Sequence, residues 1–310
     1  RAGSLRGGIS LRFIHREPVV GDHPMTTRPP AIAPPRRTPY DTDPVVTFDN
    51  VRLGFDEGDI LRGLSFRVLP RETLILLGET GTGKTLTLKL AAGLLHPSQG
   101  RVSVLGHEVS SMSETDLLHF RRQIGFVFQE GALFDSMTVA DNVAYRLRED
   151  RVDEAEIDQR VREVLKFVEL EHTLDLLPSE LSGGMRRRVA IARALVSRPQ
   201  IVLYDSPTAG LDPVTSQTII TLILRLRDVY GVTALLATHR VQDGFALANF
   251  KFDPQARRVV RDPASSSRIQ ANLDEPVTRF VVYNEGRIYF DGTPEEIAST
   301  RDPYLKRYLV

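Results

Sequence analysis

The stretch Gly78-Glu-Thr-Gly-Thr-Gly-Lys-Thr85 governs how the rest of the chain is interpreted. It fits the pattern G-x-x-x-x-G-K-[ST], and it lies between an apolar, strand-sized run at 73–77 and a helical pattern over 84–95. A strand, a glycine-rich turn and a helix in this order form a phosphate-binding loop. The glycines let backbone N–H groups turn toward an anion, and the helix presents its positive end to the same anion. A tight glycine turn without a ligand is the alternative.

The residue types within this stretch suggest separate roles. Lys84 can reach the β- and γ-phosphates of a nucleotide, and the hydroxyl of Thr85 can bind Mg²⁺. We therefore predict that the chain binds ATP and Mg²⁺ here. The predicted nucleotide-binding residues of the stretch are Gly78, Glu79, Thr80, Gly81, Thr82, Gly83, Lys84 and Thr85.

Length and composition limit the class of protein. The 310 residues suffice for one large domain or two modest ones. Forty basic residues balance forty acidic ones, and a net charge of zero argues against a protein that coats nucleic acid. The absence of cysteine excludes disulfides and thiolate metal sites, and it fits a cytoplasmic protein. No apolar run approaches the roughly 20 residues that span a bilayer, so other subunits must supply any membrane part.

Proline and charge patterns divide the chain. Residues 1–44 are proline-rich and lack apolar periodicity, so we expect a disordered or extended tail, with a targeting peptide at 1–16 as an alternative. Residues 1–24 precede the first methionine and are either an upstream extension or not natural sequence. One folded domain is expected over 45–300, followed by a short tail at 301–310.

Within the folded part, strand and helix patterns alternate. Short apolar runs at 201–204 and 233–237 are typical of buried parallel strands, and the alternation predicts an α/β fold with a mostly parallel sheet. A helical subdomain is expected over about 130–200. Residues 251–278 break the pattern with arginines, proline and serines, which predicts a loop or an insertion. A hairpin is predicted around Asn284-Glu-Gly286.

Three further patterns place polar groups at the ends of predicted elements. Leu181-Ser-Gly-Gly-Met185 begins a helix with Ser182 as N-cap, which is either an anion-binding helix start or simply a capped helix. Asp205 ends the strand at 201–204, where a carboxylate beside the phosphate loop suits Mg²⁺. His239 ends the next strand, where it would lie beside Asp205 and hydrogen-bond a γ-phosphate or the attacking water.

Together these residues resemble the ATP-binding cassette of ABC transporters over about 45–300. The matching motifs are Walker A at Gly78–Thr85, the Q-loop glutamine Gln129, the signature at Leu181–Met185, Walker B at Ile201–Asp205, the D-loop at Ala209–Asp212 and the H-loop histidine His239. Phe55 lies where this family often places an aromatic that stacks on adenine, although a core position is the alternative. The resemblance implies a P-loop NTPase fold with a mostly parallel core sheet, an antiparallel β subdomain and a helical subdomain.

The resemblance also implies how the residues act. Two cassettes pair head to tail, as a homodimer or a heterodimer, so that each ATP lies between Walker A of one and the signature of the other. Contacts to the partner's ATP would come from Ser182, Gly183, Gly184 and Asp212. Mg²⁺ would be held by Thr85, Gln129 and Asp205. The expected catalytic residues are Ser206, His239, Gln129 and Asp205.

A finer resemblance is to the cassettes of Mla/Mce-type systems, which move phospholipids or related hydrophobic molecules between the membranes of diderm bacteria. It is carried by residues 129–148, 181–188 and 278–291. Cassettes of this family touch their permease just after the Q-loop, so residues 130–148 are expected to contact an integral membrane permease. The resemblance implies a location at the cytoplasmic face of the inner membrane and no nucleic-acid partner.

One position departs from the family pattern. The residue after the Walker B aspartate is normally a glutamate that polarises the attacking water, and here it is Ser206, a poor base. Three interpretations remain open: hydrolysis that persists with modest turnover through His239, a nearly inactive subunit that pairs with a normal partner or works as an ATP-held switch, and an engineered trap. A soluble cassette that acts on ribosomes or DNA is a further alternative, but the two cassettes or long coiled coil usual in such proteins are not seen here.

Overall fold

The computed structural model describes residues 43–56, 58–262 and 276–307. The tail predicted for 1–44, with its targeting-peptide alternative, lies outside the described residues except for its last two. Of the tail predicted at 301–310, the residues Pro303–Lys306 form the short helix α9, and 308–310 lie outside the description.

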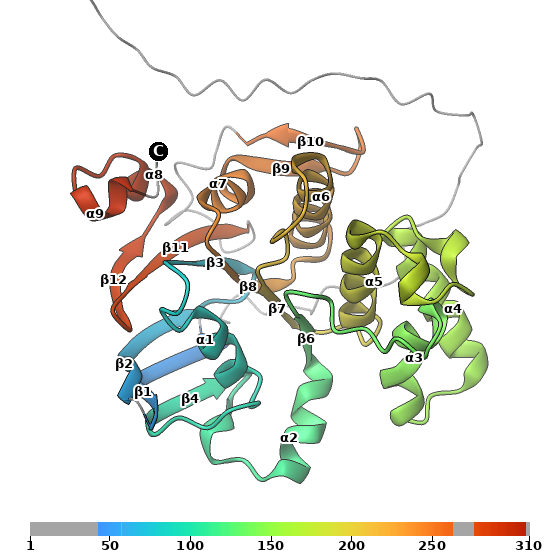
Figure 1. The fold of residues 1–310 in the computed structure, drawn as a ribbon, viewed down its shortest axis with the longest axis horizontal. Coiled ribbons are helices and arrows are strands. Elements are labelled where there is room, and N and C mark those ends of the chain that lie inside the picture. Colours follow the sequence, from blue (N-terminus) through green and yellow to red (C-terminus); the bar gives the residue numbers. More distant parts are fainter. Residues whose placement is uncertain (1–42, 57, 263–275, 308–310) are drawn as a thin grey trace, which may run out of the picture. The chain divides into compact units, whose positions relative to one another are not determined.

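A six-stranded sheet forms the centre of the fold, in the order β12-β11-β3-β8-β7-β6 (Figure 1). Its strands are β3 (Glu72–Leu77), β6 (Ile124–Val127), β7 (Ile201–Asp205), β8 (Thr233–Thr238), β11 (Val277–Asn284) and β12 (Arg287–Gly292). The strands from β11 to β6 in this order pair in parallel. Strand β12 pairs antiparallel with β11 through the predicted hairpin. Every residue of β3, β7 and β8 is buried, as expected for central parallel strands covered on both faces. The predicted mostly parallel core sheet is confirmed.

A second, antiparallel sheet has the order β2-β1-β4-β5. Its strands are β1 (Val46–Phe55), β2 (Gly58–Val68), β4 (Gln99–Val104) and β5 (His107–Glu108). Between this sheet and the central one lies helix α1 (Lys84–Ala91), which carries Leu88 and Leu90 into the apolar core there. Helix α2 (Glu114–Phe120) follows β5 and adds Leu117 and Phe120 to the same core.

The remaining helices contribute to the second apolar core, on the other face of the central sheet, where α3 and α4 pack mainly against α5 and against each other. They are α3 (Val139–Glu149), α4 (Glu154–Phe167), α5 (Gly183–Leu195), α6 (Pro213–Tyr230) and α7 (Val241–Asn249), with the short α8 (Pro294–Ala298) near the end. Single 3₁₀ turns occur at Val109–Ser111, Arg121–Gln123, Glu171–Thr173 and Pro178–Glu180. In Figure 1 the helices α3, α4 and α5, green to olive, form a group beside β6. None of the helices described is both long and apolar enough to cross a membrane.

Side chains of strand β3 belong to two apolar cores, one on each face of the central sheet. Along the strand they alternate between the faces of the sheet, so that Leu74 and Leu76 pack toward the antiparallel sheet while Ile75 and Leu77 pack toward the helices. All four are completely buried. Burial on both faces fixes the register of β3, and β3 leads directly into the glycine-rich loop.

The segment after α7, predicted to be a loop or an insertion, begins with two short strands and not with a loop. Strands β9 (Phe250–Asp253) and β10 (Arg258–Arg261) pair as an antiparallel hairpin. Asp253 organises the turn, because its Oδ1 accepts hydrogen bonds from the backbone N–H groups of Gln255 (2.9 Å) and Ala256 (3.0 Å). Short strands with charged residues and no clear alternation give a weak sequence signal, which is why the pattern suggested a loop. Residues 263–275 of the predicted insertion lie outside the described residues.

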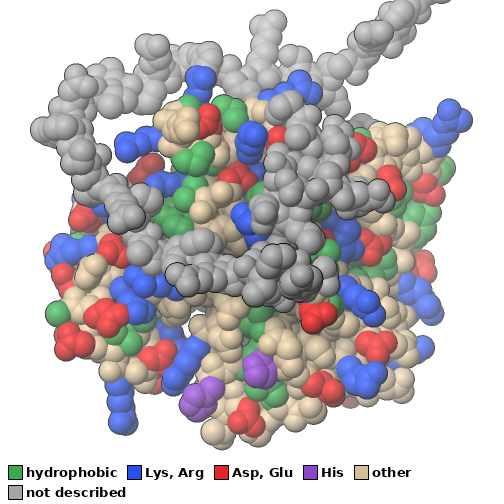
Figure 2. Space-filling model, turned by 180° about the vertical axis from the view of Figure 1, so that it is seen from behind, with side chains coloured by type: hydrophobic (Ala, Val, Ile, Leu, Met, Phe, Trp, Pro, Cys, Tyr) green, Lys and Arg blue, Asp and Glu red, His purple; other side chains and the backbone are tan. Residues whose placement is uncertain are grey.

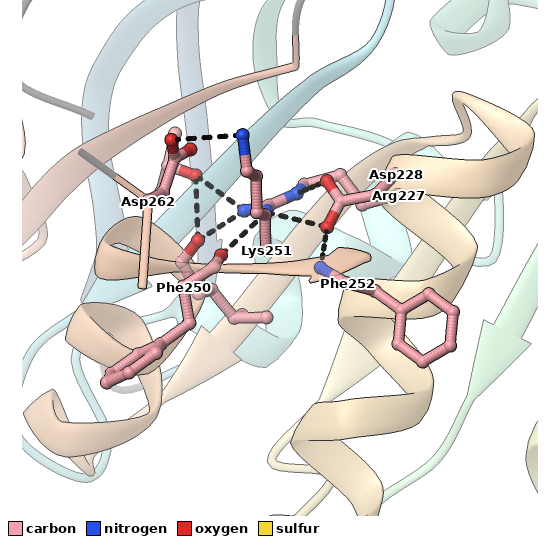
Figure 3. Close-up of polar contacts among 8 residues, drawn as sticks. Arg227, Asp228, Phe250, Lys251, Phe252 and Asp262 are labelled. Carbon is pink, nitrogen blue, oxygen red and sulfur yellow. Dashed lines mark hydrogen bonds and ion pairs between the residues drawn. The ribbon is translucent and has the colours of Figure 1, made fainter. Parts of the chain in front are cut away.

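A buried arginine attaches this hairpin to helix α6 (Figure 3). Arg227 forms an ion pair with Asp228 (2.7 Å), and its guanidinium donates to the backbone oxygens of Leu247 and Phe250, the latter at 2.8 Å. Asp228 in turn accepts from the backbone N–H of Phe252 at 2.7 Å. The side chains of Arg227 and Asp228 are 4% and 10% exposed, so their polar atoms form hydrogen bonds with the protein in place of water. The pair therefore holds α6, α7 and β9 together.

Replacing Arg227 by alanine should lower the free energy of unfolding by about 3–5 kcal/mol, because Asp228 would remain buried without its cation. Urea denaturation followed by circular dichroism measures this change. Arg162→Ala is the matched control, since Arg162 pairs with Asp158 on the exposed face of α4 and its side chain is 50% exposed. A comparable loss in both variants would contradict the structural role of Arg227.

Candidate nucleotide-binding site

The glycine-rich loop connects β3 to α1 and has a backbone that its glycines allow. Gly78, Gly81 and Gly83 have φ values of 153°, 84° and 98°, which other residues rarely adopt. At Gly83 space is restricted as well, because a Cβ atom there would lie 2.1 Å from Leu61. The loop is therefore free of side chains where it turns into the helix, and its N–H groups and the start of α1 can face an anion.

Lys84 lies against this loop as the first residue of α1. Its ammonium group donates to the backbone oxygens of Gly78 (2.8 Å) and Glu79 (2.7 Å) and to the hydroxyl of Thr82 (3.4 Å). Burial lowers the pKa of Lys84 to about 8, and the nearby charges of Asp205 and Glu79 oppose this shift. A phosphate that entered the loop would replace neutral acceptors with an anion, which a buried ammonium group binds more strongly.

Thr85 and Asp205 meet although 120 residues separate them in the sequence. The hydroxyl of Thr85 donates to Oδ1 of Asp205 at 2.9 Å. Burial raises the pKa of Asp205, and the hydroxyl of Thr85 and the charges of Lys89 and Lys84 oppose this shift. A hydroxyl and a carboxylate oxygen are the few protein ligands that Mg²⁺ uses beside substrate phosphates and water, so the donor set fits this ion. Bound Mg²⁺ would supply positive charge to the phosphates.

The carboxyl ends of four neighbouring strands meet at this edge of the sheet. Leu77 pairs with Thr238 across β3 and β8, and Asp205 pairs with Ala237 across β7 and β8. His239 follows β8 directly, and Gln129 follows β6, whose Val127 pairs with Tyr204. Both His239 and Gln129 are exposed. The predicted order of strands is thus observed, and it brings these side chains to the same edge as the glycine-rich loop.

Ser206 has an unusual backbone for a residue with a side chain. Its φ is 46°, in the left-handed region, and its N–H donates to the backbone oxygen of Ala237 at 2.8 Å. This bond ties the residue after β7 to β8. The backbone of Ser206 is therefore held by the sheet.

Two predicted residues act as helix caps in the structure. Ser182 accepts a hydrogen bond from the N–H of Met185 (3.2 Å) at the start of α5, and Asp212 accepts from the N–H groups of Val214 and Thr215 (both 3.0 Å) at the start of α6. The side-chain hydroxyl of Thr215, followed by these backbone bonds, lowers the pKa of Asp212. Ser182 and Asp212 are both exposed and so remain accessible to a second molecule.

Two other predicted nucleotide-binding residues differ in exposure: Gly184 is buried and Phe55 is exposed. A Cβ atom on Gly184 would lie 2.3 Å from Thr215, so this glycine permits the close approach of α5 and α6, while Gly183 beside it is exposed. Phe55 ends β1 and is 56% exposed, which excludes the alternative that it belongs to the core.

Comparison with known proteins gives a consistent result. The sequence profile of the family described as "ABC transporter" matches residues 61–209. Over 262 residues the chain is 35% identical to the methionine import ATP-binding protein MetN of Bifidobacterium longum, which covers 82% of this chain and 64% of that protein. Over 232 residues it is 34% identical to the intermembrane phospholipid transport system ATP-binding protein MlaF of Haemophilus influenzae, covering 74% of this chain and 88% of that protein.

A solved structure agrees with these sequence matches. The dimeric ATP-binding cassette MJ0796, in a post-hydrolysis state bound to ADP and Pi, has a TM-score of 0.66 and 26% identity, and it covers 80% of this chain and 98% of that one.

The chain belongs to the ATP-binding proteins of ABC transporters. It has the family and the fold of ABC-type ATPases. The finer resemblance to Mla/Mce-type cassettes is not singled out, because a methionine importer matches as well as the phospholipid system does.

The cassette also contains a buried side chain that the sequence analysis overlooked. Arg187 of α5 is 6% exposed and donates to the backbone oxygens of Phe128 (2.9 Å) and Ala209 (3.4 Å). Burial lowers its pKa, and the charges of Glu130 and Asp205 oppose this. The signal was present in the run of arginines at 186–188, because three consecutive residues cover most of a helix's circumference and cannot all face water. Arg187 thereby connects the signature helix to the residue before Gln129 and to the D-loop.

Replacing Lys84 by methionine should weaken ATP binding by about 10- to 100-fold, because a charge-assisted hydrogen bond to phosphate would be lost. Titration with a fluorescent ATP analogue measures the dissociation constant. Lys166→Met provides the control, since Lys166 is an exposed residue in the last turn of α4. Unchanged affinity in the Lys84 variant would exclude this loop as the phosphate site.

Proposed function

We propose that this cassette binds Mg²⁺-ATP between two cassettes and powers a membrane permease that moves a phospholipid or a related hydrophobic molecule. The observation that carries the nucleotide part is the contact of Thr85 with Asp205 beside the glycine-rich loop. The lipid part is supported by the finer sequence resemblance and by the match to the phospholipid system of Haemophilus influenzae, of which the chain covers 88%.

We assign the predicted residues to the following roles. The backbone of 78–85 and Lys84 bind the phosphates, and Thr85, Asp205 and Gln129 hold Mg²⁺. His239 hydrogen-bonds the γ-phosphate or the attacking water from its exposed position at the end of β8. The exposed ends of α5 and α6, with Ser182 and Asp212, contact the ATP of the partner cassette. Phe55, exposed at the end of β1, stacks on adenine.

Ser206 favours slow hydrolysis in this arrangement. A neutral serine hydroxyl cannot accept a proton as a carboxylate does, and general-base help typically contributes about 10²- to 10⁴-fold. Binding is expected to depend little on this residue, because the phosphate contacts are assigned to the glycine-rich loop and Lys84. The same observation supports a second function, a cassette in which bound ATP acts as a switch and is rarely hydrolysed.

Ser206→Glu should raise the rate of ATP hydrolysis by roughly 10²-fold while leaving the affinity for ATP unchanged, because it restores a carboxylate beside Asp205. Phosphate release by the purified chain and by the variant measures this gain. Ser206→Gln is the control, since the amide has a similar size but no basic oxygen. A gain below about threefold would show that Ser206 does not limit catalysis.

The expected permease contact has an apolar and well-fixed surface. Phe134 and Tyr145 are 42% and 38% exposed, and their rings lie 4.8 Å apart. Asn142, which is completely buried, fixes the loop that carries Phe134. Its amide donates to the backbone oxygens of Phe134, Met137 and Thr138, all at 3.0 Å, and its Oδ1 accepts from the N–H of Phe134 at 2.7 Å. We propose that the aromatic pair docks against a cytoplasmic helix of the permease.

The charged side chains on the face shown in Figure 2 can be compared with those expected of a soluble cassette that acts on ribosomes or DNA. Lys and Arg side chains are interspersed with Asp and Glu among the residues described there. Proteins that bind nucleic acid through its phosphates gather basic side chains on one face. Among the described residues, this face therefore offers no purely basic surface for nucleic acid.

Phe134→Ala should weaken co-purification of the proposed membrane permease partner by about 30-fold, because a buried aromatic anchor commonly contributes 2 kcal/mol or more to an interface. Quantitative pull-down from detergent extracts measures the change. Leu69→Ala serves as the control. Leu69 is similarly exposed (44%), but it lies in the turn before β3, outside residues 130–148. Equal binding by both variants would exclude this surface, and salt-sensitive RNA binding would support the soluble alternative.

A further inference from the structure

A buried carboxylate outside the proposed nucleotide contacts lies between two segments of the site. Asp243, in the first turn of α7, is 4% exposed. Its Oδ2 accepts hydrogen bonds from the hydroxyl of Thr208, in close contact, and from that of Thr238 at 3.4 Å. Thr208 follows β7 and Thr238 ends β8, and both are almost completely buried. One carboxylate thus binds the segment that carries Ser206 and the segment that carries His239.

Arg240 reinforces this connection from the residue after His239. Its guanidinium donates to the backbone oxygen of Thr208 (3.3 Å) and to the hydroxyl of Ser216 (3.0 Å), and it forms an ion pair with Asp243 at 3.8 Å. Its own N–H donates to the hydroxyl of Thr238 at 3.0 Å. The cation therefore compensates the charge of Asp243 and binds the same two segments.

Burying a carboxylate is costly unless hydrogen bonds and a cation compensate it. Burial raises the pKa of Asp243, and the hydroxyls of Thr208 and Thr238 together with the charges of Arg240 and His239 oppose the shift. Hydrogen bonds to an ionised acceptor are short and roughly twice as strong as those between neutral groups. Such bonds hold donors in fixed positions, which a site assembled from separate loops requires.

We infer that Asp243 is a positioning residue, which fixes His239 relative to Ser206 by binding the hydroxyls of Thr208 and Thr238. The inference rests on the proposed roles of His239 and Ser206 in hydrolysis. The backbone bond from Ser206 to Ala237 (2.8 Å) joins the same two segments one step closer to the sheet. The contacts of Asp243 extend this connection to the segments that follow β7 and β8, beside which the reacting groups of ATP would lie.

The test removes the hydroxyl of Thr208 and retains the approximate shape of the side chain. In the full chain, Thr208→Val should lower kcat for ATP hydrolysis roughly 10- to 100-fold, because a small displacement of a catalytic group is enough for such a loss. The dissociation constant for ATP should change less than about twofold, because binding depends on the glycine-rich loop. Thr208→Ser, which retains the hydroxyl, should restore kcat.

Thr173→Val is the matched control. Thr173 is also completely buried, and its hydroxyl donates to a backbone oxygen, that of Leu170 at 2.8 Å, within the helical group. Its replacement also removes a hydrogen bond of a buried hydroxyl, and it should leave kcat unchanged. The double variant of Thr208→Val with Asp243→Asn should lose no more kcat than the more affected single variant, because both changes break one interaction.

Hydrogen exchange gives a second measurement that does not require hydrolysis. Thr208→Val should increase exchange about tenfold in both 206–212 and 238–243, and Thr173→Val in neither. Equal kcat and equal exchange in Thr208→Val and Thr173→Val would overturn the inference, as would a parallel loss of ATP affinity and kcat. If the unmodified chain binds ATP without detectable turnover, the proposed hydrolysis fails, and the exchange of the two segments still decides the role of Asp243.

Discussion

The parallel pairing of β3, β8 and β7 is the constraint on which the rest of the structure depends. Because Leu77 lies beside Thr238 and Ala237 beside Asp205, three loops leave the sheet at the same edge. Every residue of these strands is buried, so the register cannot shift without exposing apolar side chains. The glycine-rich loop, the Asp205 carboxylate and His239 are therefore brought together by apolar packing, before any polar contact between them is considered.

Much of the fold and of the candidate site could be predicted from the sequence because their signals are local. A strand, a glycine pattern and a helix in succession identify the loop at 78–85, and a carboxylate at a strand end identifies Asp205. The hairpin β9–β10 was missed because its few residues have mixed polarity. Arg227 and Arg187 were missed because they bind backbone oxygens of distant residues, which any sequence provides, although the run of arginines at 186–188 hinted at a buried one. Asp243 was missed because its main partner, the hydroxyl of Thr208, lies 35 residues away.

The construction of the candidate site separates the groups proposed to bind phosphate from the groups proposed to act on water. The proposed phosphate contacts come from one continuous stretch, whose geometry is set by glycines and by the start of α1. The groups expected to act on water come from three separate segments, and their relative positions depend on side chains such as Asp243 and Arg240. A substitution such as serine at position 206 can therefore change turnover while nucleotide affinity stays the same. Substrate choice lies outside both, since relatives with different cargoes share the same cassette.

The hydrogen bonds between the side chain of Asn142 and the loop before α3 have a consequence for evolution. These side-chain hydrogen bonds go to backbone atoms of Phe134, Met137 and Thr138, which any residue provides except proline at position 134. The shape of the loop is thus independent of the side chains it displays. Exposed positions there can diversify to suit a different permease while the backbone keeps its conformation. A gene duplication could in this way give a cassette with a new membrane partner after very few substitutions, without any change to the ATP site.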